Sequence, residues 1–411
     1  MEIPLAQNGL DEIEVELVSS IFRSGNVTMG KEVEAFESSF AKKLQVKHAI
    51  MVNSCSSANL LALEILAATI AEEDVSSRAK FYVAVPAILW PTSIWPIIQL
   101  GFHALIIDTA KNSLEIDFNL LIEAKKKYGS ALVGVVLIHP LGKSLDLNKI
   151  AKLQDDLGLF IVEDNAESLG AGSPEKFAGT VGDVGTFSFY YSHHITTVEG
   201  GMIVTNLDST ANRILSMRAH GWTRNRLDKK EIENNYSNFN KDFLFVTSGY
   251  NFRPMEFQGA LGVSQLKKLD DFLEKRLAII SKVLETLHGS NFHVLGSTKE
   301  TSESNTRVDL TQGPIPHSWM AIPISYRGKN LTLTQIHKTL NDFGVATRPI
   351  LAGNFINQPA GKHQMISKFG NLPNSENIYA SSFMIGNHHN ISDGQLEHLL
   401  NTLRRIIEID G

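Results

Sequence analysis

The chain contains a single cysteine, Cys55, among its 411 residues. A lone thiol forms no intramolecular disulfide and cannot supply the cysteine set that holds an iron–sulfur cluster. Lys and Arg number 38 against 44 Asp and Glu, so the formal charge of −6 leaves no general basic excess for nucleic acid. No apolar run approaches the ~20 residues that cross a bilayer, and the acidic first stretch lacks a signal-peptide pattern. We therefore expect a cytoplasmic protein with neither nucleic acid nor membrane as partner.

What the sequence does contain is the ordinary composition of a globular enzyme, with 43% hydrophobic and 20% charged residues. Over the first two-thirds, strand-like apolar runs alternate with helical patterns, which predicts an α/β fold with a mostly parallel sheet flanked by helices. The expected strands are 81–85, 104–107, 131–137, 160–162, 186–190 and 202–205. The expected helices are 33–44, 57–68, 120–127, 147–157 and 211–218.

The last third predicts a second, smaller unit. A long amphipathic helix is expected at 255–287, followed by a polar stretch at 289–314. Strands at 319–324 and 345–348 and helices at 333–343 and 395–407 then suggest a small α/β domain. We place a large cofactor-binding domain at 1–260 and the connecting helix with the small domain at 261–411. The polar, Asn-rich segment 223–242 is expected to be an exposed excursion.

The most informative segment runs from Ser188 to Gly201. Its letters, SFYYSHHITTVEGG, follow the frame S-F-x-x-x-K-x-I and E-G-G, except that position 193 carries histidine in place of lysine. This frame resembles the cofactor segment of the DegT/DnrJ/EryC1/StrS family of pyridoxal-phosphate sugar aminotransferases, whose fold is the fold-type I, aspartate aminotransferase-like one. In that family the lysine binds the cofactor covalently and shuttles a proton. The resemblance implies that His193 has lost the covalent link but, with an ordinary pKa of about 6.5, retains general acid–base catalysis.

Further segments match other parts of a pyridoxal-phosphate site. Asp164 ends an apolar strand, where its carboxylate can hold the pyridine nitrogen protonated; the alternative is a helix cap or a surface acid. Glu167 is a second candidate contact to the cofactor. Cys55 and Ser56 open a helix, where backbone N–H groups can bind phosphate, although an ordinary N-cap is the competing interpretation. Ser188 is the other phosphate candidate.

Trp90 matches the aromatic residue that stacks on the cofactor ring in the family; a buried core tryptophan is the alternative. Asn251 lies in a G-Y-N-x-R segment whose asparagine, in the family, reaches the phosphate of the neighbouring subunit, which implies a homodimer with shared active sites. His220 is a candidate catalytic residue and Arg348 a candidate for binding a substrate carboxylate or diphosphate. A structural histidine and a surface salt bridge are the respective alternatives.

His193 and His194 are adjacent, and neighbouring side chains of an extended stretch point in opposite directions. No third ligand stands at metal-site spacing. We therefore expect no metal site, and His194 is interpreted as structural.

The segments around His193 and His220 resemble the dehydratase branch of the family. This resemblance implies pyridoxal and pyridoxamine phosphate as cofactors, L-glutamate as amino donor and no iron–sulfur cluster. The substrate would be a nucleotide-linked 4-keto-6-deoxyhexose, with GDP and the manno configuration favoured, that loses its C3 hydroxyl while ammonia is released. The setting would be lipopolysaccharide O-antigen synthesis, with colitose as the dideoxysugar. Two alternatives stay open: a nucleotide-sugar aminotransferase and a non-catalytic cofactor-binding homologue.

Overall fold

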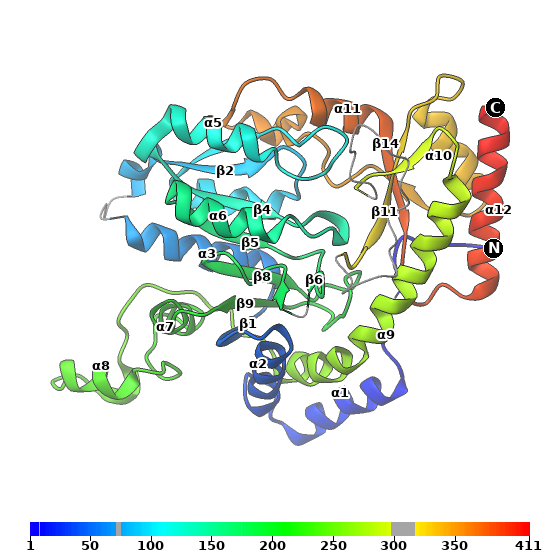
Figure 1. The fold of residues 1–411 in the computed structure, drawn as a ribbon. Helices are drawn as coiled ribbons and strands as arrows, with labels where there is room; N and C mark the ends of the chain where they lie inside the picture. Colours follow the sequence, from blue (N-terminus) through cyan, green and yellow to red (C-terminus); the bar gives the residue numbers. More distant parts are fainter. Residues whose placement is uncertain (8, 71–74, 174, 297–316) are drawn as a thin grey trace.

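The computed structural model describes residues 1–7, 9–70, 75–173, 175–296 and 317–411. Within these residues, eight strands form one sheet at the left and centre of Figure 1. Only β9 runs antiparallel to its neighbours β1 and β8, while the other pairs in this sheet are parallel. In spatial order the strands are β1 (His48–Val52), β9 (Gly201–Thr205), β8 (Val184–Ser188), β5 (Phe160–Asp164), β4 (Leu132–Ile138), β2 (Tyr82–Pro86), β3 (His103–Ile107) and β13 (Ile366–Lys368).

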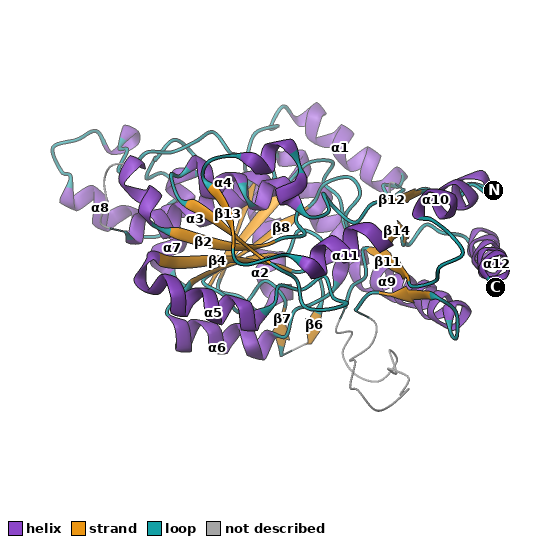
Figure 2. Cartoon of the chain, turned by 90° about the horizontal axis from the view of Figure 1, so that it is seen from above, coloured by secondary structure: helices purple, strands orange, loops and turns teal. Residues whose placement is uncertain are grey.

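Helices cover both faces of this sheet, as Figure 2 shows. One face packs against α3 (Cys55–Thr69), α4 (Trp95–Gln99) and α7 (Asp208–Met217), and the other against α5 (Phe118–Tyr128) and α6 (Leu147–Leu157). Alternation along β2 explains the arrangement, because Val83 and Val85 enter the first apolar cluster while Ala84 enters the second. Strands that are buried on both faces read as continuous apolar runs, which is why the sequence revealed them.

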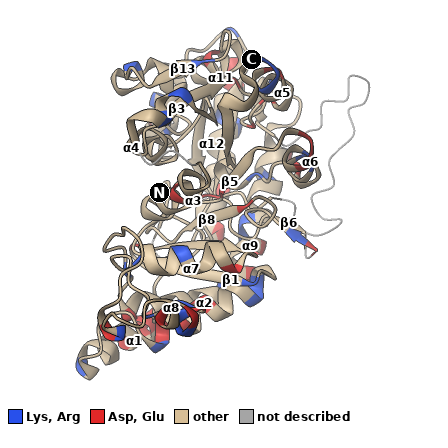
Figure 3. Cartoon of the chain, turned by 90° about the vertical axis from the view of Figure 1, so that its left-hand side faces the viewer, with Lys and Arg blue, Asp and Glu red and all other residues tan. Residues whose placement is uncertain are grey.

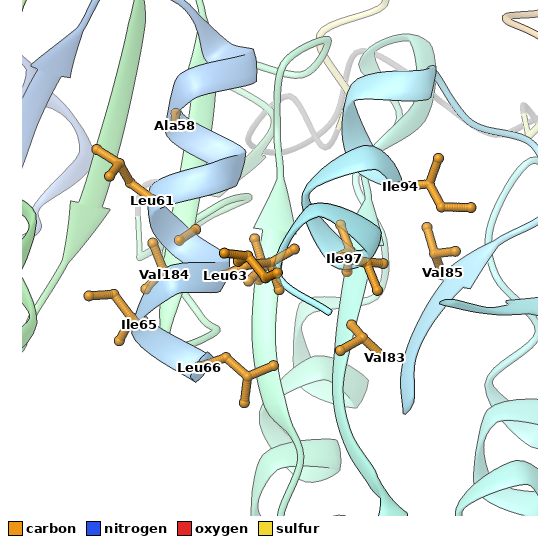
Figure 4. Packing of buried hydrophobic residues seen from close by; sticks show 14 of the residues in the cluster. Ala58, Leu61, Leu63, Ile65, Leu66, Val83, Val85, Ile94, Ile97 and Val184 are labelled. Atoms are coloured by element: carbon orange, nitrogen blue, oxygen red, sulfur yellow. The ribbon is translucent and has the colours of Figure 1, made fainter. Parts of the chain in front are cut away.

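Helix α3 contributes many side chains to the first cluster, among them Leu61, Leu63 and Leu66 (Figure 4). It is apolar nearly all round, with Leu61, Leu63 and Leu66 each almost fully buried, and such a helix belongs in an interior. Its first turn is fixed by Ser54, whose hydroxyl accepts a hydrogen bond from the backbone N–H of Ser57 at 3.2 Å. The first turn of α3 lies at the edge of the sheet where β5 and β8 end.

The second, four-stranded sheet lies at the right of Figure 1. Its strands are β10 (Phe292–Val294), β11 (Ala321–Tyr326), β14 (Ser382–Gly386) and β12 (Thr347–Arg348), in that order. They pack against α10 (Leu333–Asp342), α12 (Asp393–Asp410) and the later half of α9 (Glu256–Leu287). The first half of α9 instead packs, with α2 (Lys31–Leu44), against the β1–β9–β8 end of the large sheet. One continuous helix thus connects the two sheets.

The other described elements are small or peripheral. Helix α8 (Lys229–Asn235) projects from the body at the lower left of Figure 1, where α1 (Glu12–Ser24) lies at the bottom and α11 (Pro373–Ser381) at the top. The hairpin of β6 (Gly172–Ser173) and β7 (Lys176–Phe177) lies at the lower edge of Figure 2. In Figure 3, acidic and basic residues are interspersed along α1, α2 and α8. None of the described helices is long and apolar enough to serve as a membrane span.

These observations confirm the expected α/β architecture. Every expected strand lies within two residues of an observed one, and every helix within three. The expected strand at 186–190 ends earlier, at Ser188, because the chain then turns into the loop that carries His193. Strand β1 and helix α1 had no sequence-based prediction, and the same holds for β10, β13, β14, α4 and α11.

The domain boundary near residue 260 stays a prediction. The two halves of α9 pack against different sheets, whereas β13, from the C-terminal stretch, joins the large sheet beside β3. The excursion at 223–242 is largely exposed and includes α8. Most of the polar stretch at 289–314 lies outside the described residues.

Helix α12 offers a test of how the small sheet is stabilised. Ile406 is 1% exposed in the apolar cluster, and Ile409, three residues later on the same helix, is 52% exposed. Replacing Ile406 with Ala should lower the free energy of unfolding by roughly 2–5 kcal/mol, because a buried side chain is lost and a cavity remains. Ile409→Ala should change it by less than about 0.5 kcal/mol. Urea unfolding followed by circular dichroism measures both, and equal effects would contradict the packing described.

Candidate active site

A pocket of about 440 Å³ lies between the two sheets. One wall is made by the carboxyl ends of β4, β5 and β8 together with the first turn of α3, and the other by Met320, Arg348 and Met384 of the small-sheet region. Ligands of open α/β sheets bind at this edge, outside the carboxyl ends of the parallel strands. The residues that this pocket brings together include eight of the predicted site residues: Cys55, Ser56, Trp90, Asp164, Glu167, Ser188, His193 and Arg348.

Asp164 is the last residue of β5 and is 4% exposed. Its Oδ2 accepts hydrogen bonds from the hydroxyl of Ser93 at 2.7 Å and from Nδ2 of Asn59 at 2.9 Å. Asn59 is itself oriented by the hydroxyl of Thr186, which donates to its Oδ1 at 2.6 Å. A carboxylate fixed in this way presents a stationary negative charge to the pocket, as a protonated ring nitrogen requires.

The first turn of α3 forms the polar end of the pocket, where Ser54, Cys55 and Ser56 all line it. Free backbone N–H groups at a helix start suit an anion such as phosphate. Gly201 lies directly behind this turn: a Cβ there would lie 2.5 Å from the carbonyl group of Ser54 and 2.6 Å from the backbone nitrogen of Cys55. Burial, then the charge of Asp164, raises the pKa of the Cys55 thiol well above its ordinary value, so this side chain is a neutral thiol.

His193 lies on the loop after β8 and also lines the pocket, with its ring edge-on to Tyr190 at 6.0 Å between centroids. Its Nδ1 is buried and has no hydrogen-bond partner among the described residues. Burial lowers the pKa of His193 to about 4; the Ser188 backbone opposes this shift, and the positive charge of Arg276 adds to it. The imidazole is therefore neutral near pH 7 and is ready to accept a proton.

His194 points away from the pocket. It is 1% exposed, and its Nε2 lies 3.2 Å from the carbonyl oxygen of Ser318. This contact anchors the loop to the segment that precedes β11, in agreement with the structural role expected of His194. Among the described residues, no group of three or more His, Cys, Asp or Glu side chains is arranged to hold a metal ion.

Glu167 and Arg348 lie in the same pocket with opposite charges. Oε2 of Glu167 accepts a hydrogen bond from the backbone N–H of Leu141 at 2.8 Å. Burial raises the pKa of Glu167 to about 7, with Asp164 adding to the rise and Arg348 and the Leu141 N–H opposing it. The guanidinium of Arg348 also lies 5.9 Å from the ring centroid of Trp90, a half-exposed side chain. Trp90 therefore faces the pocket and is no core tryptophan.

Two predicted residues lie elsewhere within this chain. Asn251 lines a second pocket of about 880 Å³ instead, and Glu199 is the one described residue common to both pockets. His220 lines neither of them: its side chain is exposed, and its backbone N–H donates to the carbonyl of Tyr250 at 2.8 Å. A catalytic role for His220 stays a prediction.

Sequence reasoning missed several side chains that shape the pocket. Asn59 follows Cys55 by one helical turn, so it shares the pocket-facing side of α3, and this spacing was the available signal. Ser93 follows Trp90 by one turn of a short 3₁₀ helix. Met320 directly precedes β11 and Met384 lies in β14, far apart in sequence, and no local pattern indicates either of them.

Comparison with known proteins agrees with this geometry. Residues 8–404 match the DegT/DnrJ/EryC1/StrS aminotransferase family. The chain belongs to this family. A GDP-4-keto-6-deoxy-D-mannose 3-dehydratase of Yersinia pseudotuberculosis is 34% identical, over 98% of this chain and 99% of that protein.

Solved structures extend the family assignment to the fold. An E. coli GDP-4-keto-6-deoxy-D-mannose-3-dehydratase with bound hydrated PLP superposes with a TM-score of 0.85 at 31% identity, covering 99% of each chain. A structure of a GDP-4-keto-6-deoxymannose-3-dehydratase with a trapped PLP-glutamate geminal diamine gives 0.83 at 31% identity, covering 100% of both chains. The fold is therefore the fold-type I arrangement expected from the sequence.

The neutral state of His193 predicts an acid-dependent loss of stability. The folded protein keeps this imidazole unprotonated down to about pH 4, whereas the unfolded chain takes up a proton near pH 6.5. The contribution of His193 to stability is therefore complete above about pH 6.5. As the pH falls from there toward 4, this contribution is lost and the free energy of unfolding decreases by roughly 1–3 kcal/mol. Glu167 acts with the opposite sign, because its raised pKa favours the folded state at low pH.

Comparison of variants isolates the contribution of His193. Urea unfolding of the cofactor-free protein gives the free energy of unfolding at about pH 7 and about pH 5. Between these two pH values, this free energy should fall less in His193→Asn than in the unsubstituted chain. His363→Asn, at an exposed position outside the pocket, is the control and should behave as the unsubstituted chain does. An equal acid-induced loss in His193→Asn would contradict a desolvated His193.

Proposed function

We propose that the protein is a pyridoxal- and pyridoxamine-phosphate-dependent 3-dehydratase acting on a nucleotide-linked 4-keto-6-deoxyhexose, GDP-4-keto-6-deoxy-D-mannose. L-Glutamate restores the amine form of the cofactor, and the products are the 4-keto-3,6-dideoxy sugar and ammonia. The observation that carries this proposal is the position of His193. It lies in one pocket with Asp164, Trp90 and Ser188, and no lysine is among the described residues that line that pocket.

The pocket fits the cofactor by the chemistry of its side chains. Asp164 supplies a fixed carboxylate for the ring nitrogen, and Trp90 supplies a flat apolar face for the ring. Ser56, Ser188 and the N–H groups at the start of α3 supply donors for the phosphate, where Gly201 leaves room for close backbone approach. Relatives whose structures contain PLP, at 31% identity, support the same assignment.

Histidine in place of lysine favours dehydration over amino transfer. When bound, the cofactor would supply an amine for the sugar ketone and a ring that delocalises electrons. His193 would take a proton from the carbon attached to the cofactor ring and would donate one to the departing C3 hydroxyl. A neutral imidazole performs both transfers, yet it forms no stable covalent bond with an aldehyde, so it does not compete with the substrate for the cofactor.

The remaining pocket side chains suit substrate recognition. Arg348 is a fork of N–H donors that can bind a carboxylate of glutamate or a diphosphate oxygen pair. It lies opposite Glu167, whose pKa of about 7 lets that carboxyl group hold or release a proton during the cycle. The choice of GDP and of the manno configuration is supported by the 34% identity to the Yersinia dehydratase. We assign the product to colitose formation for O-antigen synthesis, in the cytoplasm, as the sequence predicts.

A homodimer with shared active sites is part of this proposal. Asn251 lies outside the pocket of its own chain, in a second pocket that meets the first at Glu199. Aromatic side chains are also exposed close to that second pocket: Phe243 is 65% exposed and Phe245 50%, and both stack on Trp222. Apolar surface of this kind indicates a protein interface, and a second copy would bring its Asn251 to this chain's pocket.

The product identifies the reaction. Purified protein with pyridoxal phosphate, L-glutamate and GDP-4-keto-6-deoxymannose should yield a sugar lacking one oxygen, seen by mass spectrometry, and an equal amount of ammonia. His193→Asn should bind pyridoxamine phosphate but slow product formation by roughly 10²- to 10⁴-fold, the contribution of general acid–base catalysis. His363→Asn should leave the rate unchanged.

Three outcomes would each contradict a part of the proposal. A stable aminosugar without ammonia would make the protein an aminotransferase despite His193. Full activity of His193→Asn would remove that residue from the mechanism. Formation of 2-oxoglutarate without any sugar product would exclude this substrate while leaving the cofactor chemistry in place.

Complementation tests the shared site. His193→Asn and Asn251→Ala should each be inactive as homodimers, whereas a mixed dimer, purified with two affinity tags, contains one site with both native residues. It should recover roughly half of the native activity. A mixed dimer as inactive as its parents would place both residues in one chain's own site.

A further inference from the structure

Behind the His193 loop lies a buried cation that the proposed mechanism does not use. Arg276, on α9, is 2% exposed, and it forms no ion pair with a carboxylate among the described residues. One of its guanidinium nitrogens donates to the carbonyl of Met320 at 3.0 Å and to the carbonyl of Asn387. An unpaired buried charge is expensive to desolvate, so its retention calls for a function.

The two carbonyls that Arg276 binds stand side by side at one end of the small sheet. Met320 directly precedes β11 and Asn387 directly follows β14, and the adjoining residues Ala321 and Gly386 are register partners. Nδ2 of Asn387 donates to the carbonyl of Trp319 at 2.7 Å. Arg276 thus ties both strands to the helix that connects the two sheets.

The segment Ser318–Met320 carries this connection to the pocket. Its backbone N–H groups donate to the turn at Leu141 and Gly142, at 2.7 Å from Ser318 and 3.0 Å from Met320, and the same turn binds Glu167 through the N–H of Leu141. The carbonyl of Ser318 contacts Nε2 of His194. Met320 itself lines the pocket. This segment therefore meets the pocket at three points, and His193 is adjacent to one of them.

The segment needs external support to keep its shape. Trp319 has a φ of 41°, in the left-handed region that disfavours a bulky side chain, and Leu141 opposite it has a φ of 50°. Such backbone conformations persist only where the surroundings determine them strongly. The donors of Arg276 and Asn387 supply that support on the side away from the pocket.

We propose that Arg276 is a positioning residue for His193, which it fixes through the Ser318–Met320 segment and His194. This inference rests on the proposed role of His193 and adds to it a residue that touches neither cofactor nor substrate. Because no carboxylate in the part of the chain that the structure describes pairs with Arg276, its positive charge acts on the nearby imidazoles of His193 and His194.

The electrostatic effect follows from this arrangement. Burial first, and then the charge of Arg276, lowers the pKa of His193, and the same two causes lower the pKa values of His194, His388 and His389. Phe272, one turn before Arg276, stacks on His389 at 3.6 Å between ring centroids and keeps water from that side. Among the described residues, the other ionisable side chains that line the pocket around His193 are Cys55, Asp164, Glu167, Tyr190, Glu199 and Arg348.

Two substitutions separate position from charge. Arg276→Gln removes the charge but can still donate to a carbonyl, and Arg276→Lys keeps the charge but loses the planar fork. We expect both to lower kcat by roughly ten- to a hundredfold, the effect of displacing a catalytic group by about 1 Å, with KM changed less. In the His193→Asn background neither should lower kcat further, because residues that act as a unit are not additive.

A second readout needs neither cofactor nor turnover. Nuclear magnetic resonance of histidine labelled with nitrogen-15, with His193 assigned from the His193→Asn spectrum, should show its titration moved to higher pH in Arg276→Gln and unmoved in Arg276→Lys. Lys275→Gln is the matched control: it removes the same charge from the adjacent, exposed position of α9 and should leave kcat and the His193 titration unchanged.

The outcomes distinguish this inference from the proposed function. If no dehydration is observed with any sugar, the titration of His193 in the cofactor-free protein still reports on Arg276. An unchanged titration in Arg276→Gln, with circular dichroism showing the native fold, would overturn the electrostatic part. A kcat of both variants within twofold of the unsubstituted enzyme would overturn the positioning role. If Arg276→Gln does not fold, the kcat of Arg276→Lys alone decides whether Arg276 positions His193.

Discussion

The close approach of β9 to the first turn of α3 is the contact on which the site depends. Gly201 has no side chain, so the backbone at the start of β9 lies against Ser54 and Cys55. This contact fixes the helix start, with its free N–H groups, beside the carboxyl ends of β5 and β8. Asn59, one turn further along the helix, then reaches Asp164. A single rigid helix therefore sets the distance between the proposed phosphate site and Asp164, the proposed partner of the ring nitrogen.

The proposed chemistry depends on how burial away from water changes the pKa of His193. Burial keeps the His193 imidazole uncharged near neutral pH, while it raises the pKa of Glu167 in the same pocket to about 7. Desolvation disfavours the charged form of each group, so it moves the two pKa values in opposite directions. The pocket thus holds a neutral base and a carboxyl group that exchanges a proton near pH 7. In family members that carry lysine at this position, the resemblance implies that one residue combines proton transfer with a covalent bond; we propose that His193 performs the proton transfer alone.

The small sheet completes the pocket from the opposite side, and α9 holds it in place. Its first half packs against the large sheet and its second half against the small one, with Arg276 in the second half bound to the ends of β11 and β14. The strained segment at Trp319 is fixed between this arginine and the turn that binds Glu167. The wall that carries Met320 and the loop that carries His193 are thus connected by hydrogen bonds through the protein interior. A shift in the position of either should therefore shift the other.

By itself, the sequence determined the fold class, the positions of most strands and helices, and the identity of eight residues that meet in one pocket. Buried parallel strands can be recognised in a sequence because they are continuous apolar runs. The site residues can be recognised because the SFYYSHHITTVEGG segment and the other matching motifs each consist of residues that are close together in the sequence. Only the tertiary structure decided that Trp90 faces the pocket, that Asn251 lies outside it and that Asn59 and Ser93 hold Asp164. It alone also placed Arg276 behind His193. These facts depend on which distant segments come together and on how much water they exclude, and neither burial nor the pKa values that follow from it can be read from the order of residues along a chain.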